Sequence, residues 1–164
     1  MAAHDLTAAR LRELVDYDGL TGLFTRRVRT GSSIAGKVLG TVHKHGYVVI
    51  RLDYKLYKAH RLAWLHVIGE WPANEIDHID GDRSNNRIAN LRDVSRRVNA
   101  ENMRAAKPGS RSGLLGVEPH GKFSFRAQIK VNGTMIRLGS FPTKELAHAV
   151  YVSAKRRLHE GNTL

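Results

Sequence analysis

The chain has 164 residues, of which 41% are hydrophobic and 26% charged, the composition of a folded globular protein rather than of a disordered one. Its 27 Lys and Arg outnumber its 15 Asp and Glu, so the formal net charge is +12. This excess predicts a polyanionic partner, nucleic acid foremost, with an anionic membrane surface as the competing interpretation. No apolar run reaches the roughly 18 residues of a membrane-spanning helix. The lack of cysteine excludes disulfides and thiolate-bound zinc.

The N-terminal residues, MAAHDLTAARLRELV, lack the charged-then-apolar order of a signal peptide. They predict instead a first helix with Thr7 as its N-cap and Leu11, Leu14 and Val15 on one face. We therefore expect a soluble protein of the cytoplasm.

Two segments with turn signals, residues 17–28 and 45–61, are predicted to form strands. The next segment, RLAWLHVIG, has the spacing of a helix and is expected to stop at Gly69. Further along, AAKPGSRSG combines Pro, Gly and Ser without apolar periodicity, which is the composition of a linker at residues 105–112. From Arg104 onward there are 11 Lys or Arg against 3 acids, a net of +8, which leaves +4 for the first 103 residues.

The C-terminal residues predict three antiparallel strands and one helix. FSFRAQIKV, residues 123–131, alternates apolar and polar side chains, and Asn132-Gly133 is a hairpin signal before TMIRLGSF. The helix is expected to begin after Thr143 and to bury Leu146, Val150 and Ala154. The opposite sheet face carries polar and cationic side chains, namely Arg126, Gln128, Lys130 and Arg137. A solvated sheet face is the plain interpretation, and base or phosphate contact in the DNA major groove is the functional one.

Residues 113–161, GLLGVEPHGKFSFRAQIKVNGTMIRLGSFPTKELAHAVYVSAKRRLHEG, resemble the DNA-binding domain of the plant APETALA2 and ethylene-response transcription factors. The resemblance lies in GV, RAQI, the NG turn, LGSF and the alanine-bearing helix. It implies that the three-stranded sheet lies in the major groove and that His120 joins the outward residues in contacting DNA. The plant domains have several arginines and a tryptophan near the first strand, where this chain has Glu118, Pro119 and His120.

The stretch EIDHIDGDRSNNRIANLRDVSRRVNAEN, residues 75–102, predicts a strand, a polar loop, a second strand and a helix capped by Ser95. This order would bring Asp77 and His78 from the first strand near Asn99 from the helix. Asp and Asn supply hard oxygen ligands, which suit Mg²⁺ or Mn²⁺ rather than zinc. A neutral histidine beside such an ion is the usual general base for activating water in phosphodiester hydrolysis.

Other interpretations of this stretch stay open at this point. His78 would also fit a surface or hydrogen-bonded histidine. Asp77, Asp80 and Asp82 would also fit calcium, although the twelfth-position Glu of an EF-hand loop is absent. Several further polar residues would also fit turn or solvated positions, namely Asn85, Asn86, Arg92, Arg96 and Arg97.

Residues 59–103, AHRLAWLHVIGEWPANEIDHIDGDRSNNRIANLRDVSRRVNAENM, resemble the HNH endonucleases of phages and group I introns in motif order and spacing. The resemblance implies a ββα-metal fold in which His78 is the general base and Asn90 steadies the loop. It also implies that Asp77 and Asn99 hold one divalent ion, with Asn99 at the last position as in the His-Asn-Asn subgroup. His60 and Arg61 match a recurrent HR pair that would pack or contact phosphate.

We therefore predict an α+β protein with a nuclease domain at residues 1–104, in which a leader, 1–58, precedes the motif, 59–104. A linker at 105–112 and a DNA-binding module at 113–164 would follow. The expected activity is nicking of double-stranded DNA by a monomer, with a dimer as the alternative, in a phage-encoded or homing endonuclease. Arg61, Arg96 and Arg97 are candidate DNA contacts beside those of the C-terminal sheet. The rival hypothesis is a non-catalytic, sequence-specific DNA-binding protein.

Overall fold

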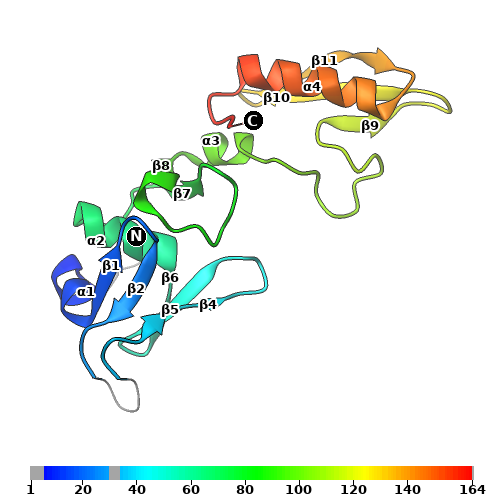
Figure 1. Cartoon of the computed structure of the whole chain (residues 1–164). Coiled ribbons are helices and arrows are strands. Elements are labelled where there is room, and N and C mark those ends of the chain that lie inside the picture. Colours follow the sequence, from blue (N-terminus) through cyan, green and yellow to red (C-terminus); the bar gives the residue numbers. More distant parts are fainter. Residues whose placement is uncertain (1–5, 30–33, 164) are drawn as a thin grey trace. The chain divides into compact units, whose positions relative to one another are not determined.

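The computed structural model describes residues 6–29 and 34–163 (Figure 1). It is a mixed α+β protein of small antiparallel sheets and helices, in agreement with the fold class that the sequence predicts. The described residues group into two compact units that divide between Val94 and Ser95, and each has its own buried apolar side chains. No described helix has the length and apolar character required to cross a membrane.

The first unit opens with α1 (Ala8–Leu14), and Thr7 caps it as predicted, since Thr7 Oγ1 accepts a hydrogen bond of 3.1 Å from the Arg10 amide. Val15 is buried as expected but begins a strand instead of continuing the helix. Two three-stranded antiparallel sheets follow, in the orders β1-β2-β3 and β4-β5-β6. Their strands are Val15–Asp18, Leu23–Arg26, Val38–Leu39, Thr41–Val42, Val48–Leu52 and Lys55–Lys58.

Helix α2 (Ala59–Ile68) ends at Gly69, whose φ of 91° is the left-handed conformation that glycine adopts without a Cβ clash. This end confirms the predicted stop. The helix begins at Ala59, so His60 and Arg61 lie on its first turn and not on the strand expected to reach residue 61. The hairpin of β7 (Glu75–His78) and β8 (Leu91–Val94) comes next, with a short 3₁₀ turn, η1 (Ile88–Asn90), before β8.

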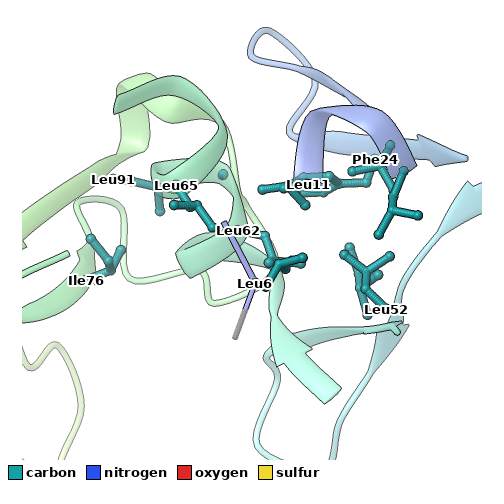
Figure 2. Close-up of a cluster of buried hydrophobic side chains, with 13 residues drawn as sticks. Leu6, Leu11, Phe24, Leu52, Leu62, Leu65, Ile76 and Leu91 are labelled. Atoms are coloured by element: carbon teal, nitrogen blue, oxygen red, sulfur yellow. The ribbon is translucent and has the colours of Figure 1, made fainter. Parts of the chain in front are cut away.

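One cluster of buried side chains joins these elements (Figure 2). It includes side chains from α1, β2, β5 and α2, namely Leu11, Phe24, Leu52, Leu62 and Leu65. Ile76 of β7 and Leu91 of β8 belong to the same cluster, each 6% exposed. Burying each of these two side chains is worth about 1.5–3 kcal/mol, so the core holds the β7–β8 hairpin in place.

The second unit begins with the short helix α3 (Arg96–Glu101), which Ser95 caps as predicted. A sheet in the order β11-β10-β9 and the long helix α4 follow, with bounds Val117–Pro119, Phe125–Val131, Thr134–Phe141 and Lys144–Leu158 for β9, β10, β11 and α4. Asn132 and Gly133, at φ 50° and 85°, form the predicted tight turn, and Thr143 caps α4 as predicted.

Two side-chain predictions for this unit are wrong. Helix α4 buries Ala147, Tyr151 and Ala154, whereas Leu146 is 51% exposed. The predicted and the buried faces of α4 are neighbours that share Ala154, and the buried one also carries Ala147 and Tyr151. Phe123 is 80% exposed, since β10 begins only at Phe125 and the preceding turn lies outside the sheet.

Candidate active site

The β7–β8 hairpin positions the acid and the histidine that the sequence singles out. Its register pairs Asp77 with Arg92 and His78 with Leu91. Asp77 is 5% exposed and His78 4% exposed, so both polar side chains at the end of β7 are buried. Buried polar groups at the end of a short strand require partners, and the two residues obtain different ones.

Asp77 forms an ion pair with Arg92 across the hairpin. Both Nε and an Nη of Arg92 donate to Asp77 Oδ2, at 2.9 and 2.7 Å. The buried carboxylate therefore has a forked guanidinium contact as its partner. Arg92, which by sequence would also fit a solvated position, lies on β8 with a half-buried side chain.

His78 is held by an amide of the loop that follows β7. Its Nε2 lies 3.5 Å from Asn86 Oδ1, while Asn86 Nδ2 donates to the Ser84 carbonyl at 3.0 Å. Because the amide nitrogen is used by Ser84, the atom that faces the ring is an acceptor. This contact favours the tautomer in which Nε2 carries the ring proton and Nδ1 carries the basic lone pair. Burial lowers the pKa of His78, against the opposing effects of Asn86 and Asp80, so the ring is neutral at pH 7.

Two further rings surround His78. His60 on α2 meets it edge-on, with ring centres 5.0 Å apart, and Tyr47 lies 6.0 Å from His78 and 5.2 Å from His60. Burial, with the charges of His78 and Lys58 next in importance, lowers the pKa of His60 to about 3. The His60 Nδ1 atom is buried without a hydrogen-bond partner among the described residues. No local sequence pattern indicates that Tyr47 or Asn86 would lie beside His78.

Asn90 ties the two ends of the loop between β7 and β8 together. Its Oδ1 accepts from the Asp80 amide at 3.0 Å, and its Nδ2 donates to Asp80 Oδ1 and to the Asn85 carbonyl at 3.0 and 2.9 Å. Asp82 in turn accepts from the Ser84 amide and hydroxyl. The side chains of Asp80 and Asp82 are thus used within the loop, which matches their interpretation as loop structure.

Asn99 lies on α3 and so belongs to the second unit, whereas Asp77 and His78 belong to the first. Within the second unit, α3 is held by the C-terminal residues. Arg97 bridges Glu101 and Glu160 at 2.8 and 2.7 Å, and Glu101 Oε2 accepts from the Gly161 amide at 3.1 Å. Arg97, a predicted DNA contact, is therefore engaged in ion pairs, while Arg96 on the same helix is exposed.

The donor chemistry of Asp77 and Asn99 fits a hard divalent cation. A carboxylate and an amide carbonyl are oxygen donors, and Mg²⁺ is commonly bound by one or two such groups, with water and substrate phosphate completing the octahedron. Among residues 6–29 and 34–163 no three His, Cys, Asp or Glu side chains gather in a way that could hold a metal.

Arg61 is largely committed to structure. Its guanidinium lies 5.6 Å from the centre of the Trp71 ring and donates to the Asn74 carbonyl at 3.3 Å. Burial lowers its pKa. The sequence leaves packing and phosphate contact open for the pair His60 and Arg61. The contacts of Arg61 are those of a packed residue.

The other predicted DNA contacts lie in the C-terminal sheet. Register places Arg126 between Glu118 and Ser140, and Gln128 opposite Arg137. An Nη of Arg126 also donates to His120 Nδ1 at 2.5 Å. Arg137 and Lys130 are exposed, whereas Arg126 and Gln128 are half-buried.

Comparison with known proteins bears on part of the chain. Residues 57–101 match the family model of the HNH endonucleases, a span that runs from the end of β6 to the end of α3 and contains Asp77, His78, Asn90 and Asn99. Neither the curated proteins nor the solved structures contain a match to this chain. Residues 57–101 are thus similar to an HNH endonuclease domain.

Proposed function

We propose that the protein is a DNA endonuclease that hydrolyses phosphodiester bonds with His78 as general base. The observation that carries the proposal is His78 itself. Its ring is buried, neutral and oriented by Asn86, and it lies beside the Asp77 carboxylate within the segment that matches the HNH model. A neutral imidazole with a fixed tautomer is the form that can accept a proton from water at pH 7.

In the proposed reaction His78 Nδ1 takes a proton from a water molecule. The resulting hydroxide oxygen forms a bond to phosphorus, and the bond from phosphorus to the 3′ oxygen breaks. The leaving oxygen gains a proton from solvent, which gives a 5′-phosphate and a 3′-hydroxyl. A divalent ion held by Asp77 and Asn99 would supply positive charge to the phosphorus centre and the leaving oxygen. Asn90 would keep the loop that carries Asn86 in shape.

The net charge and the C-terminal sheet support double-stranded DNA as the substrate. The same proposal includes residues 113–164 as an APETALA2-like module that recognises the DNA sequence. Its contacts in the major groove would come from Arg126, Gln128, Lys130 and Arg137. A single site per chain would cut one strand, so a monomer would nick. A nicking enzyme of this kind would serve as a phage-encoded or homing endonuclease.

A second candidate is a DNA-binding protein without nuclease activity. The Asp77–Arg92 ion pair favours it, because a carboxylate already neutralised by a guanidinium has less need of a metal. The first candidate would bind and cleave DNA, whereas the second would bind DNA without cleaving it.

The experiment is to incubate the purified chain with supercoiled plasmid and Mg²⁺, with and without chelator. We expect nicked circles only when Mg²⁺ is present, and at least about a 100-fold loss of rate in His78→Gln. The variant should bind DNA as the wild type does, which shows that it is folded. Binding without nicking by the wild type would select the second candidate.

A further inference from the structure

Two cations are held against one aromatic ring at the edge of the candidate site. Tyr47 follows the turn between β4 and β5, and its ring centre lies 4.6 Å from Lys58 Nζ and 5.0 Å from Arg83 Cζ. Lys58 ends β6 and Arg83 belongs to the loop between β7 and β8. Three separate parts of the chain thus place two positive charges around the same ring, which we call the Tyr47 cation patch.

Hydrogen bonds hold this patch together. The Arg83 guanidinium donates to the His45 carbonyl at 3.0 Å, which links the loop after β7 to the β4–β5 turn. The turn itself is closed by the amides of His43 and Gly46, which donate to the carbonyls of Tyr47 and His43 at 2.8 Å each. Arg83 and the turn that carries Tyr47 are therefore held in place before any ligand arrives, which reduces the side-chain entropy lost on binding.

Neither cation of the patch has a carboxylate partner among the described residues, unlike Arg92 and Arg97. Both side chains are exposed. Because they lie on the same ring, their positive charges repel each other, and the ring quadrupole offsets only part of this cost. An anion between or above the two cations would remove the repulsion.

The patch adjoins the base. The Tyr47 ring that carries both cations is also the ring that lies 6.0 Å from His78. A DNA strand whose scissile phosphate is at His78 carries further phosphates to either side, one for each nucleotide. The Tyr47 cation patch is thus placed to meet a neighbouring phosphate of the same strand.

We propose that Lys58 and Arg83 bind a backbone phosphate of double-stranded DNA next to the bond that His78 acts on. The proposal rests on the proposed function for the identity of the ligand. Phosphate contacts of this kind fix the register of the strand without reading its sequence.

The test measures binding of the full chain to duplex DNA over a range of salt concentrations, in the presence of chelator so that nothing is cleaved. Lys58→Ala and Arg83→Ala should each lower the slope of log affinity against log salt by about 1, equally for unrelated DNA sequences. The matched control is Lys55→Ala, which removes the same charge from the other end of β6. It should leave the slope unchanged.

Conservative variants separate charge from structure. Lys58→Arg keeps the charge over the ring and should restore the slope, and Tyr47→Phe should bind as the wild type because the ring is retained. The proposal is overturned if Lys58→Ala and Arg83→Ala keep the wild-type slope, or lose no more than Lys55→Ala. Because binding is measured without cleavage, this result is separate from the plasmid assay, whose failure would overturn the nuclease function alone.

Discussion

At Asp77, the burial of the side chain and its negative charge have opposing effects on the stability of the fold. It is 5% exposed, and the contact with Arg92 offsets the cost of removing a charge from water. His78, the proposed general base, follows Asp77 directly at the end of β7.

Arg92→Ala should lower the free energy of unfolding of the first unit by about 2 kcal/mol, because a buried carboxylate loses its forked partner. Trp64 and Trp71 pack against the core cluster of this unit, so their fluorescence during urea unfolding reports its stability. Arg10→Ala is the control, since it breaks a surface ion pair with Asp53 and should change stability by less than about 1 kcal/mol. Equal losses in the two variants would contradict the buried ion pair.

His60 makes the stability of the first unit depend on pH. Its pKa is about 3 in the folded chain, against an ordinary value of 6.5 in the unfolded chain. Between these values the unfolded state binds a proton that the folded state does not, so acid favours unfolding. The stability contributed by the neutral ring is present above pH 6.5 and falls below it, by up to about 1.4 kcal/mol per pH unit. His60→Asn should show a shallower fall between pH 6.5 and 4 in urea unfolding followed by tryptophan fluorescence.

The candidate site residues could be singled out from the sequence, whereas their neighbours in space could not. Asp77 and His78 stand out because of their order and spacing within a polar stretch. By sequence, Asn86 fits a turn position and Tyr47 lies in a segment predicted to form strands. Their approach to His78 depends on hairpin register and on where α2 begins, which are tertiary contacts that no local pattern specifies.

At the scale of elements, the tight contact between Gly116 and the ring of Tyr151 fixes how α4 lies on its sheet. A Cβ on Gly116 would overlap that ring, and the φ of 74° is left-handed as well. Gly113 has a similar φ of 71° but no atom within 4 Å of the place a Cβ would take. The two glycines therefore differ in packing and agree in backbone conformation.

Gly113→Ala should cost about 1 kcal/mol, the price of a left-handed alanine. Gly116→Ala should cost about 3 kcal/mol or more, because the overlap with Tyr151 is added. Hydrogen exchange of peptides from β10 and β11 measures the stability of this unit separately from that of the tryptophan-bearing one. A similar loss of protection in both variants would contradict the contact.

The ends of elements were more predictable than their buried faces. Thr7, Ser95 and Thr143 cap helices, and Gly69 ends one, because capping depends on a few neighbouring atoms. The buried face of α4 is predicted correctly at Ala154 and wrongly at Leu146, because two adjacent faces of the helix carry apolar side chains. Packing against the sheet, which the helix sequence does not contain, selects between them.

The whole molecule has a net charge of +12 that is divided unequally, with most of it in the last third of the chain. A charge excess by itself gives binding that depends on salt and not on sequence. The statement to be tested is therefore that the cations of the C-terminal sheet contribute more to DNA binding than cations elsewhere in the chain.

The double variant Arg126→Gln/Arg137→Gln should lower the salt slope of DNA binding by about 2 and the affinity about 10-fold or more. Both residues lie in the sheet, on β10 and β11. The matched double variant Arg156→Gln/Arg157→Gln removes the same charge from the last turn of α4. We expect it to have the smaller effect, and equal effects in a salt titration would mean that binding is not concentrated on the sheet.

Two contacts hold helix α3 to the C-terminal residues: the ion pair of Arg97 with Glu160, and the hydrogen bond that the Gly161 amide donates to Glu101. Lys155 of α4 also donates to the carbonyl of Met103, just beyond α3. A chimera joined within residues 105–112 would give α3, and with it Asn99, a foreign C-terminus without these partners. A junction before Ser95 would transfer the helix together with the residues that hold it. In a chimera with another protein, α3 should therefore be transferred together with the C-terminal sheet, although it belongs to the segment that matches the HNH model.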